Sequence, residues 1–573
     1  MSMGSGGKEH SNTRPGRGRS AVLQIAVLLL FVLSYSTVSA QSKSDMEELR
    51  RRSKTEAEEL QREREAPEVR LQPSIQADDS LTLPAEKNCF PIREIRMEGD
   101  RDNLFPWVQV YLDKYSGRCI GAEGLNLIIK RLTGRFIDRG YITTRAGAPE
   151  QDLKKRVLRI VVVPGIVGGV RFVDPKIRGT WKTAFPVRPG DTLNLRDLEQ
   201  GLEQLKRVPS QDAEMKIAPG RRLGESDVII DVKRSKPWRL TLSVDDSGSK
   251  ATGKLQFATG LSVDNPLGLN DLLNLGISTD VDGSDQRGTK GRNASYSVPW
   301  GYWTFAFSAG AFKYHQTVAG ASQTLDYSGD SSMGEAKIQR VVHRTRDSRT
   351  SLQFRVSRSH SDSYIEDTEI EVQHRVATAA EIALLHRHYF GPAQLDVTLG
   401  HRQGVPWFGA VDDPPESLSG QPTRFYKMET LDAGLAVPFK LYGRSLRYVG
   451  LFRGQYTKSP LFYTDMFSIG NRWTVRGFDG ELTLAAERGF TISNELSLSL
   501  MDRLAVYAGV DHGQVDGPND PNLIGKSLTG GVFGVRGGFF GFSFDAFIGC
   551  PLDRPQGFKT EQTTMGFQAA FQF

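Results

Sequence analysis

The chain has 573 residues, of which 38% are hydrophobic and 24% charged, and a formal net charge of +6. This length predicts more than one domain. The composition excludes a bundle of transmembrane helices, which needs many apolar runs of about 20 residues. The 9% of aromatic residues excludes disorder over most of the chain. A soluble globular protein and a transmembrane β-barrel, whose strands are only half apolar, both remain.

Residues 1–40 are predicted to be a cleaved export signal. Basic residues precede the apolar run 21–33, and small residues at 38–40 offer a cleavage site. The alternative is a membrane anchor, for which the run is short. Cleavage removes four basic residues and one acidic residue, so the net charge falls from +6 to +3. This near balance gives little support to nucleic-acid binding.

The three cysteines are Cys89, Cys119 and Cys550. Export to an oxidising compartment favours a disulfide between Cys89 and Cys119 and leaves Cys550 unpaired. Three free buried thiols are the alternative.

Residues 41–66 are predicted to form a helix. The segment 42–66 contains no Gly or Pro, and its Glu and Arg residues often lie three or four positions apart. The helix has no wide apolar face to bury in a core. We therefore expect it in water, for example in a water-filled lumen. A polar linker, 67–87, follows it.

Two similar modules come next, over residues 88–166 and 167–237. Each reads as strand, short helix, longer helix, strand, strand, which is an internal repeat. The longer helices are expected over 124–140 and 195–208, and a short helix near 181–185. Each module should contain a small sheet with an open edge, to which an extended incoming chain can add as a strand. We expect Lys216 and Asp231 on such edges; the alternative is that the modules are only spacers.

From residue 238 to the end the hydrophobic period is two. Leu496 and Leu498, for example, alternate with Glu495 and Ser497, and about sixteen such segments occur. This repetition predicts a barrel with lipid outside and water inside; a soluble β-sandwich is the alternative. The alternation runs to the last residue, which predicts a final strand that must pair to close the sheet. We expect its aromatic residues Phe567, Phe571 and Phe573 to form the C-terminal signal for barrel assembly.

A stretch at about 459–488 breaks the alternation and is long for a hairpin loop. It contains the sequence TVRGFDG, whose central residues are Val475, Arg476, Gly477 and Phe478. Glycine permits a close approach, and a guanidinium group binds a carboxylate through two parallel hydrogen bonds. These residues suit the tip of a loop that folds into the barrel.

Strand parity supplies a partner for this loop. In 504–513 the apolar side chains share one face and Asp511 lies on the other, with space beside it at Gly509 and Gly513. We predict an ion pair between Arg476 and Asp511 that holds the loop in the pore. The alternative is an exposed loop arginine and an unpaired lumenal aspartate.

These motifs resemble those of the two-partner secretion transporters (TpsB). The resemblance covers residues 89–573 and rests on CFPIREIRMEG (89–99), RGYITTR (139–145), FPVRPGDTLNLRDLEQGLEQL (185–205), TVRGFDG and GVDHG (509–513). It implies a mainly β fold: a C-terminal 16-stranded transmembrane β-barrel, over 238–573, preceded by two α+β POTRA domains and an N-terminal helix that plugs the pore.

The resemblance also implies a function. The POTRA domains would recognise a large TpsA-type exoprotein in the periplasm, and the barrel would export it across the outer membrane without nucleotide hydrolysis. The cargo would be a haemolysin, an adhesin or a contact-dependent inhibition toxin. Outer-membrane lipid and the barrel-assembly machinery would be further partners, and nucleic acid would not.

No enzyme, metal or cofactor site is expected. The sequence has no HExxH and no CxxC pair, and the nearest approach to a phosphate-binding loop, at 520–527, lacks the first glycine. Two other functions remain open: a barrel-assembly-type insertase, which shares the loop motif, and a passive porin, which does not need residues 88–237.

Overall fold

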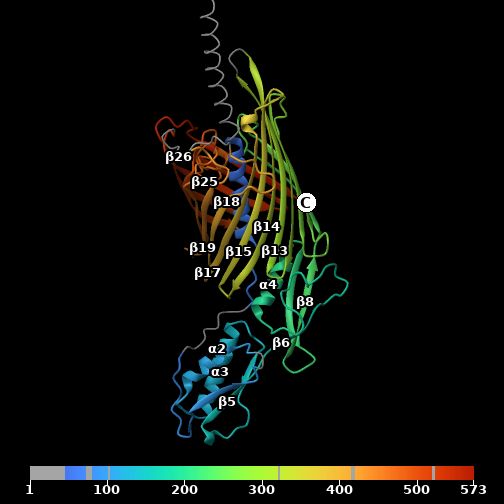
Figure 1. Cartoon of the computed structure of the whole chain (residues 1–573), viewed down its shortest axis with the longest axis vertical. Coiled ribbons are helices and arrows are strands. Elements are labelled where there is room, and N and C mark those ends of the chain that lie inside the picture. Colours follow the sequence, from blue (N-terminus) through green and yellow to red (C-terminus); the bar gives the residue numbers. More distant parts are fainter. Residues whose placement is uncertain (1–45, 72–79, 101–102, 320–322, 414–419, 519–522) are drawn as a thin grey trace, which may run out of the picture.

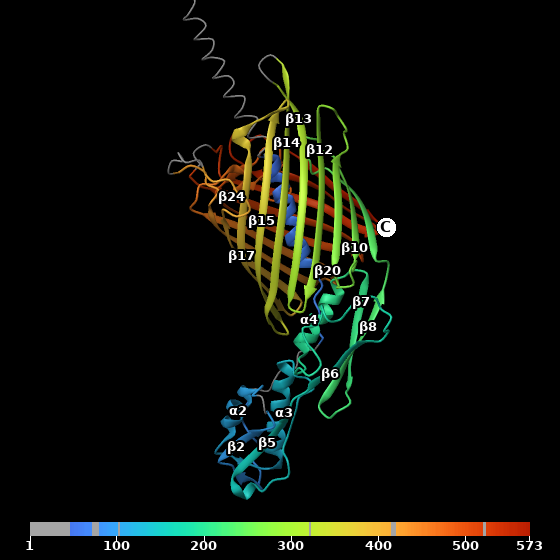
Figure 2. The ribbon, with the colours of Figure 1, turned by 45° about the vertical axis from the view of Figure 1, so that its right-hand side comes forward.

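The computed structural model describes residues 46–71, 80–100, 103–319, 323–413, 420–518 and 523–573. The predicted export signal, 1–40, lies outside these residues. Two small α+β modules and a large β-barrel follow one another, and the second module lies against one end of the barrel (Figure 1). A helix lies inside the barrel (Figure 2). The mainly β fold expected from the resemblance is confirmed.

The first module packs helices against a three-stranded sheet in the order β2–β5–β4. One face of its longer helix buries Ile128, Leu132 and Phe136, as the spacing predicted. Its elements are β1 (Phe90–Pro91), β2 (Glu94–Glu98), α2 (Pro106–Leu112), η1 (Asp113–Tyr115), β3 (Cys119–Ile120), α3 (Ala122–Asp138), β4 (Arg145–Gly147), η2 (Leu153–Lys155) and β5 (Val157–Val163).

The second module has a sheet in the order β6–β8–β7, covered by one helix. Its elements are β6 (Ile166–Phe172), α4 (Leu195–Lys206), β7 (Gln211–Pro219) and β8 (Glu225–Arg234). The short helix expected near 181–185 is not formed. The segment makes a single turn, in which the Phe185 N–H donates to the Trp181 carbonyl at 2.9 Å. Pro186 follows, and the residue before a proline disfavours helical geometry.

The expectation that Asp231 lies on a sheet edge is wrong. It lies on β8, the middle strand, opposite Glu214 of β7. A strand's position in the sheet depends on the crossover connection, which local sequence does not reveal. Lys216 lies on β7, which is an outer strand of the sheet, and its side chain is exposed.

Sixteen long antiparallel strands close the barrel, in which β27 pairs with β9. They are β9 (Trp238–Asp245), β10 (Gln256–Asp264), β11 (Leu272–Asp280), β12 (Arg287–Trp300), β13 (Trp303–Ala319), β14 (Thr324–Arg344), β15 (Ser348–Ile365), β17 (Arg375–Phe390), β18 (Ala393–Gly404), β19 (Lys427–Leu441), β20 (Arg444–Thr457), β23 (Arg488–Met501), β24 (Leu504–Asp516), β25 (Ser527–Phe539), β26 (Phe542–Asp553) and β27 (Thr564–Gln572). The two-residue β16 (Thr368–Glu369) pairs with the end of β15.

The outer face of the barrel is apolar. Leu352 and Phe354 of β15 lie opposite Leu384 and Ile382 of β17, and all four side chains are exposed. Exposed apolar residues in matched pairs are the pattern expected where a barrel faces lipid.

The helix inside the barrel spans residues 46–65 in the described part of the chain. Between helix and wall lie charged and polar side chains from both. None of the helices among the described residues combines the length and apolar character of a membrane span.

Candidate functional site

The long loop between β20 and β23 folds into the barrel. It contains η4 (Tyr463–Asp465) and a small hairpin of β21 (Phe467–Ile469) and β22 (Leu484–Ala486). Its apolar side chains form a buried cluster with residues of the wall and of the loop between β26 and β27: Phe467, Ile469, Val475, Phe478, Leu484, Ala486, Val515, Leu528 and Phe558. The loop is therefore packed like a core against one side of the lumen.

Arg476 and Asp511 lie in contact at the tip of this loop. Nε and Nη2 of Arg476 donate to Oδ2 and Oδ1 of Asp511 at 2.7 and 2.9 Å, and the Arg476 main-chain N–H donates to Oδ2 at 2.9 Å. Asp511 is fully buried. Both oxygens of the carboxylate are thus occupied by one arginine, which fixes the loop in position and in orientation.

A second carboxylate, Glu495 of β23, completes the arrangement. Nη1 of Arg476 donates to Glu495 Oε2 at 2.6 Å, and Arg536 of β25 donates to Glu495 Oε1 at 2.8 Å. Glu495 is not among the residues predicted from the sequence to hold the loop. The signal is present, however, because Glu495 lies opposite in parity to the outward-facing Leu496 and Leu498. The loop arginine is therefore held by two adjacent strands of the wall.

Glycines on the wall make room for the loop tip. A Cβ atom at Gly509 would lie 2.9 Å from Arg476 Nη2, and one at Gly513 would lie 2.8 Å from Val475 Cγ2. Gly477 has φ of 106°, and a Cβ atom there would lie 2.6 Å from the Cys550 carbonyl. Any larger residue at these positions would push the loop off the wall.

Ion pairs join the lumenal helix to the wall strands β9, β14, β15 and β20. Glu56 pairs with Arg453 of β20, and Glu59 with Lys337 of β14 at 2.5 Å and Arg355 of β15 at 3.0 Å. On the opposite side Lys54 lies 3.2 Å from Asp245 of β9. Because these attachments to the wall are charged, water can take their place when the helix is released.

The helix also contacts the inserted loop. Arg50 Nη2 donates to the Gly480 carbonyl at 2.5 Å and Arg52 Nη1 to the Thr464 carbonyl at 2.9 Å. Leu49 is buried in an apolar cluster that includes Leu461 and Met466 of the loop. Helix and loop therefore obstruct the lumen together, and the free space left between them and the wall is a cavity of about 1070 Å³.

The second module docks on the barrel through α4. Glu203 binds Arg344, at the end of β14, at 2.8 Å and also Arg349 of β15. Tyr302, in the turn between β12 and β13, donates to Asp197. The second module is thus fixed to two neighbouring turns of the barrel, a contact that no pattern in the sequence indicates.

The same arginine holds the segment that leaves the barrel after the helix. Arg344 Nη2 donates to the Val69 carbonyl at 3.0 Å, and the Leu71 N–H donates to Glu199 Oε1 of α4 at 2.9 Å. The same cluster of charged residues therefore holds both the segment that follows the helix and α4 against the barrel.

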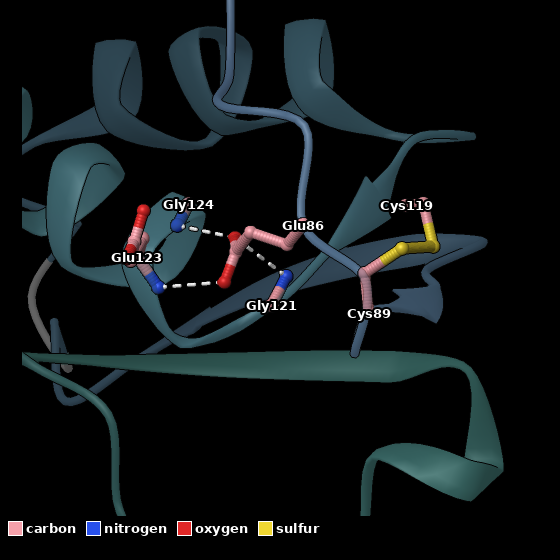
Figure 3. Close-up of a disulfide and its surroundings, with 6 residues drawn as sticks. All are labelled: Glu86, Cys89, Cys119, Gly121, Glu123 and Gly124. Carbon is pink, nitrogen blue, oxygen red and sulfur yellow. Dashed lines mark hydrogen bonds between the residues drawn. A yellow bond between two sulfur atoms is a disulfide. The ribbon is translucent and has the colours of Figure 1, made fainter.

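A carboxylate ties the linker to the first module (Figure 3). Glu86 accepts hydrogen bonds from the main-chain N–H groups of Gly124 at 2.7 Å, Glu123 at 2.9 Å and Gly121 at 3.2 Å, at the N-terminus of α3. These hydrogen bonds lower the pKa of the Glu86 carboxyl, and the bond from the Gly124 N–H has the largest effect. A Cβ atom at Gly121 would lie 2.3 Å from Glu86 Oε2, so the glycine makes the approach possible.

Cys89 and Cys119 form a disulfide close to Glu86, and this disulfide links β1 to β3 (Figure 3). Cys550 is a free, exposed cysteine on β26. Phe567, Phe571 and Phe573 are all exposed at the closing strand, and the Phe573 N–H donates to the Leu240 carbonyl of β9 at 2.9 Å.

Family models of known proteins match the barrel and the two modules as separate regions of the chain. Residues 224–537 match the family model for the haemolysin secretion/activation protein ShlB/FhaC/HecB, residues 90–165 a ShlB-type POTRA domain, and residues 166–219 a POTRA domain. Outer membrane transporter CdiB-2 of Burkholderia pseudomallei is 46% identical over 513 residues, which are 86% of this chain and 88% of the relative.

A more distant relative and a solved structure also match most of the chain. Hemolysin transporter protein ShlB of Serratia marcescens is 27% identical over 441 residues, 76% of this chain and 77% of its own length. The solved structure of CdiB from Escherichia coli superimposes with a TM-score of 0.85 at 26% identity and covers 93% of this chain and 99% of its own.

Proposed function

The chain belongs to the haemolysin secretion/activation family ShlB/FhaC/HecB, and from this premise we propose that it exports one large partner exoprotein through the lumen of its barrel. It is an outer-membrane transporter whose two POTRA domains lie in the periplasm. The match of the secretion family to residues 224–537 favours transport over insertion of barrels, and the POTRA domains favour it over passive diffusion.

The observation that carries the proposal is the double obstruction of a polar lumen. A pore for small solutes has no need of a helix held by ion pairs on opposite walls, nor of a loop fixed by a buried arginine–aspartate pair. The helix is attached mainly by charge and hydrogen bonds, which water can replace when it moves. The loop is held in addition by its apolar cluster against the wall. Such a lumen can stay nearly closed at rest and still pass an extended polypeptide.

We propose that the cargo is a TpsA-type exoprotein of the haemolysin, adhesin or contact-dependent inhibition toxin class. Of the relatives, one is named a hemolysin transporter and another the transporter CdiB-2. The outer strand β7 of the second POTRA domain, with Lys216, would capture the cargo through main-chain hydrogen bonds, which tolerate varied side chains. Progressive folding outside the cell would bias movement outward without nucleotide hydrolysis.

Two further partners follow from the barrel. The exposed apolar outer face would contact outer-membrane lipid. The closing strand with Phe567, Phe571 and Phe573 would be recognised by the barrel-assembly machinery during insertion.

The experiment is co-expression of the chain with candidate exoproteins, beginning with any large β-helical exoprotein encoded beside it, in a host that lacks such a transporter. We expect the exoprotein in the medium only when both are present. Retention of every candidate inside cells that contain folded barrel, as judged by heat-modifiable migration on gels, would contradict the proposal.

A further inference from the structure

Three side chains with metal-binding chemistry lie together outside the lumenal site. His360 and Asp362 are on β15, and His374 immediately precedes β17. One ligand atom from each lies within 4.8 Å of the others. They come from two segments that the hairpin between β15 and β17 brings together, so the cluster is formed by the fold.

The cluster is on the outside of the barrel, beyond its apolar band. His360 and Asp362 have the same parity on β15 as the exposed, lipid-facing Leu352 and Phe354. The other end of β15, at Arg349, contacts the second POTRA domain. The cluster therefore lies at the end away from the periplasm, where the outer face of the strand has changed from apolar to polar.

The carboxylate of Asp362 lies between the two imidazole rings. Its Oδ2 is 3.2 Å from Nε2 of His360, and its Oδ1 is 2.8 Å from Nδ1 of His374. Glu369 of β16 adds a second carboxylate, with Oε1 at 3.2 Å from the same Nδ1 atom of His374. The two ring centroids are 5.4 Å apart.

Hydrogen bonds among the described residues do not satisfy all the polar atoms of this cluster. Nδ1 of His374 faces two carboxylate oxygens but can carry one proton at most. Its hydrogen bond goes to Glu369, and Asp362 Oδ1, which is shielded from solvent, has no hydrogen-bond partner among the described residues. A cation bound between the rings would satisfy both the oxygen and the ring nitrogens.

We propose that His360, Asp362 and His374, with Glu369 as fourth ligand, bind a divalent transition-metal ion, with zinc as the best fit. Two imidazoles with carboxylates suit zinc, whereas calcium and magnesium prefer all-oxygen sites. Tetrahedral bonds of about 2.0–2.1 Å place neighbouring ligand atoms roughly 3.3 Å apart. The separations of 2.8 and 3.2 Å, one to each oxygen of Asp362, are within a few tenths of an ångström of this value, and the three ligand atoms all lie within 4.8 Å of one another.

Bound metal would join β15 to the surface segment 366–374, which includes β16 and η3 (Glu371–Gln373). At present β16 is held by only two pairings, Tyr364 with Glu369 and Ile365 with Thr368. The ion would thus fix the conformation of a cell-surface hairpin next to the mouth of the pore.

The test is zinc titration of the full chain in detergent, purified without a histidine tag, stripped with EDTA, and measured by competition with a chromophoric zinc chelator. The variants are His360→Ala, His374→Ala and Asp362→Asn. His401→Ala is the matched control, because His401 contacts a single carboxylate, Glu429, at 2.7 Å on the outer face of the barrel.

We expect one zinc ion per wild-type and His401→Ala chain, and affinity lower by about tenfold or more in each of the other variants. Zinc should also slow hydrogen exchange of residues 366–374 in the wild type but not in Asp362→Asn, which preserves the shape of the side chain. Absence of zinc binding in the wild type would overturn the proposal, and so would equal affinity in the three variants, each checked for a folded barrel by its migration on gels.

Discussion

Arg476 of the inserted loop and Asp511 of the barrel wall are joined by three hydrogen bonds, of which two form a fork between guanidinium and carboxylate. The aspartate is fully buried, so the pair differs from an exposed ion pair, whose contribution is about 0–1 kcal/mol. Removing the arginine would leave a buried carboxylate without its main partner, at a cost of about 3–5 kcal/mol. The pair therefore both positions the loop and stabilises its inserted state.

Replacing Arg476 by alanine should abolish export while the barrel still assembles, because the loop loses its anchor but the strands keep theirs. Exoprotein in the medium is the measurement, and heat-modifiable migration reports assembly. Lys458→Ala is the control, since Lys458 lies exposed at the base of the same loop. Export at the wild-type level by the Arg476 variant would show that the anchor is dispensable.

Deleting residues 42–66 should raise the single-channel conductance in planar lipid bilayers, because the helix occupies the lumen beside the remaining cavity. Glu56→Gln should give more frequent openings than the wild type, since Arg453 then has a weaker hold on the helix. Gln61→Ala, an exposed helix position, serves as control. Unchanged conductance after the deletion would mean that the helix does not block current.

Stability of the first POTRA domain should fall in acid through Glu86. The pKa of this carboxyl in the folded chain is lowered below its ordinary 4.5 by the N–H groups of α3. Its contribution is therefore complete above the unfolded value and is lost as the pH falls through the folded value. Hydrogen exchange at the start of α3 should rise relative to the rest of the domain below about pH 4.5.

Glu86→Gln should remove this local pH dependence, and Glu123→Gln should retain it, because Glu123 contributes its main-chain N–H and not its side chain. Equal pH dependence in wild type and Glu86→Gln would assign the acid response to another group.

Lys216→Pro should weaken binding of the exoprotein, because proline on the outer strand β7 removes a main-chain donor and disturbs strand addition. Lys216→Ala removes the same side chain and leaves the backbone intact, so it is the matched control. Surface-immobilised transporter titrated with unfolded exoprotein gives both affinities. Equal affinities would favour POTRA domains that act as spacers.

The features that could be predicted from the sequence are those that depend on the periodicity of a single segment. Alternation in 504–513 placed Asp511 on the lumenal side, and the break after residue 458 indicated the inserted loop that carries Arg476. The same parity rule applied to Glu495 would have found the second acceptor. These features are local, so a single segment contains the information.

Other features depend on how distant segments meet. The order β6–β8–β7, which puts Asp231 in the middle of its sheet, follows from a crossover connection. The contact of Glu203 with Arg344 joins a helix to a barrel turn more than a hundred residues away. His374 approaches Asp362 only because β15 and β17 are neighbours. None of these pairings leaves a pattern in either segment alone.

The hydrogen bonds of Glu86 and the neighbouring disulfide fix the linker that follows the lumenal helix to the first POTRA domain. Nineteen residues lie between Ala66, which directly follows the helix, and Glu86. The twenty Cα steps from one to the other span roughly 65 Å when fully extended. The helix itself is about 30 Å long. A helix that has left the barrel therefore remains tethered near the pore at a local concentration in the millimolar range. The same helix can then close the pore again after each exported molecule, without a second component.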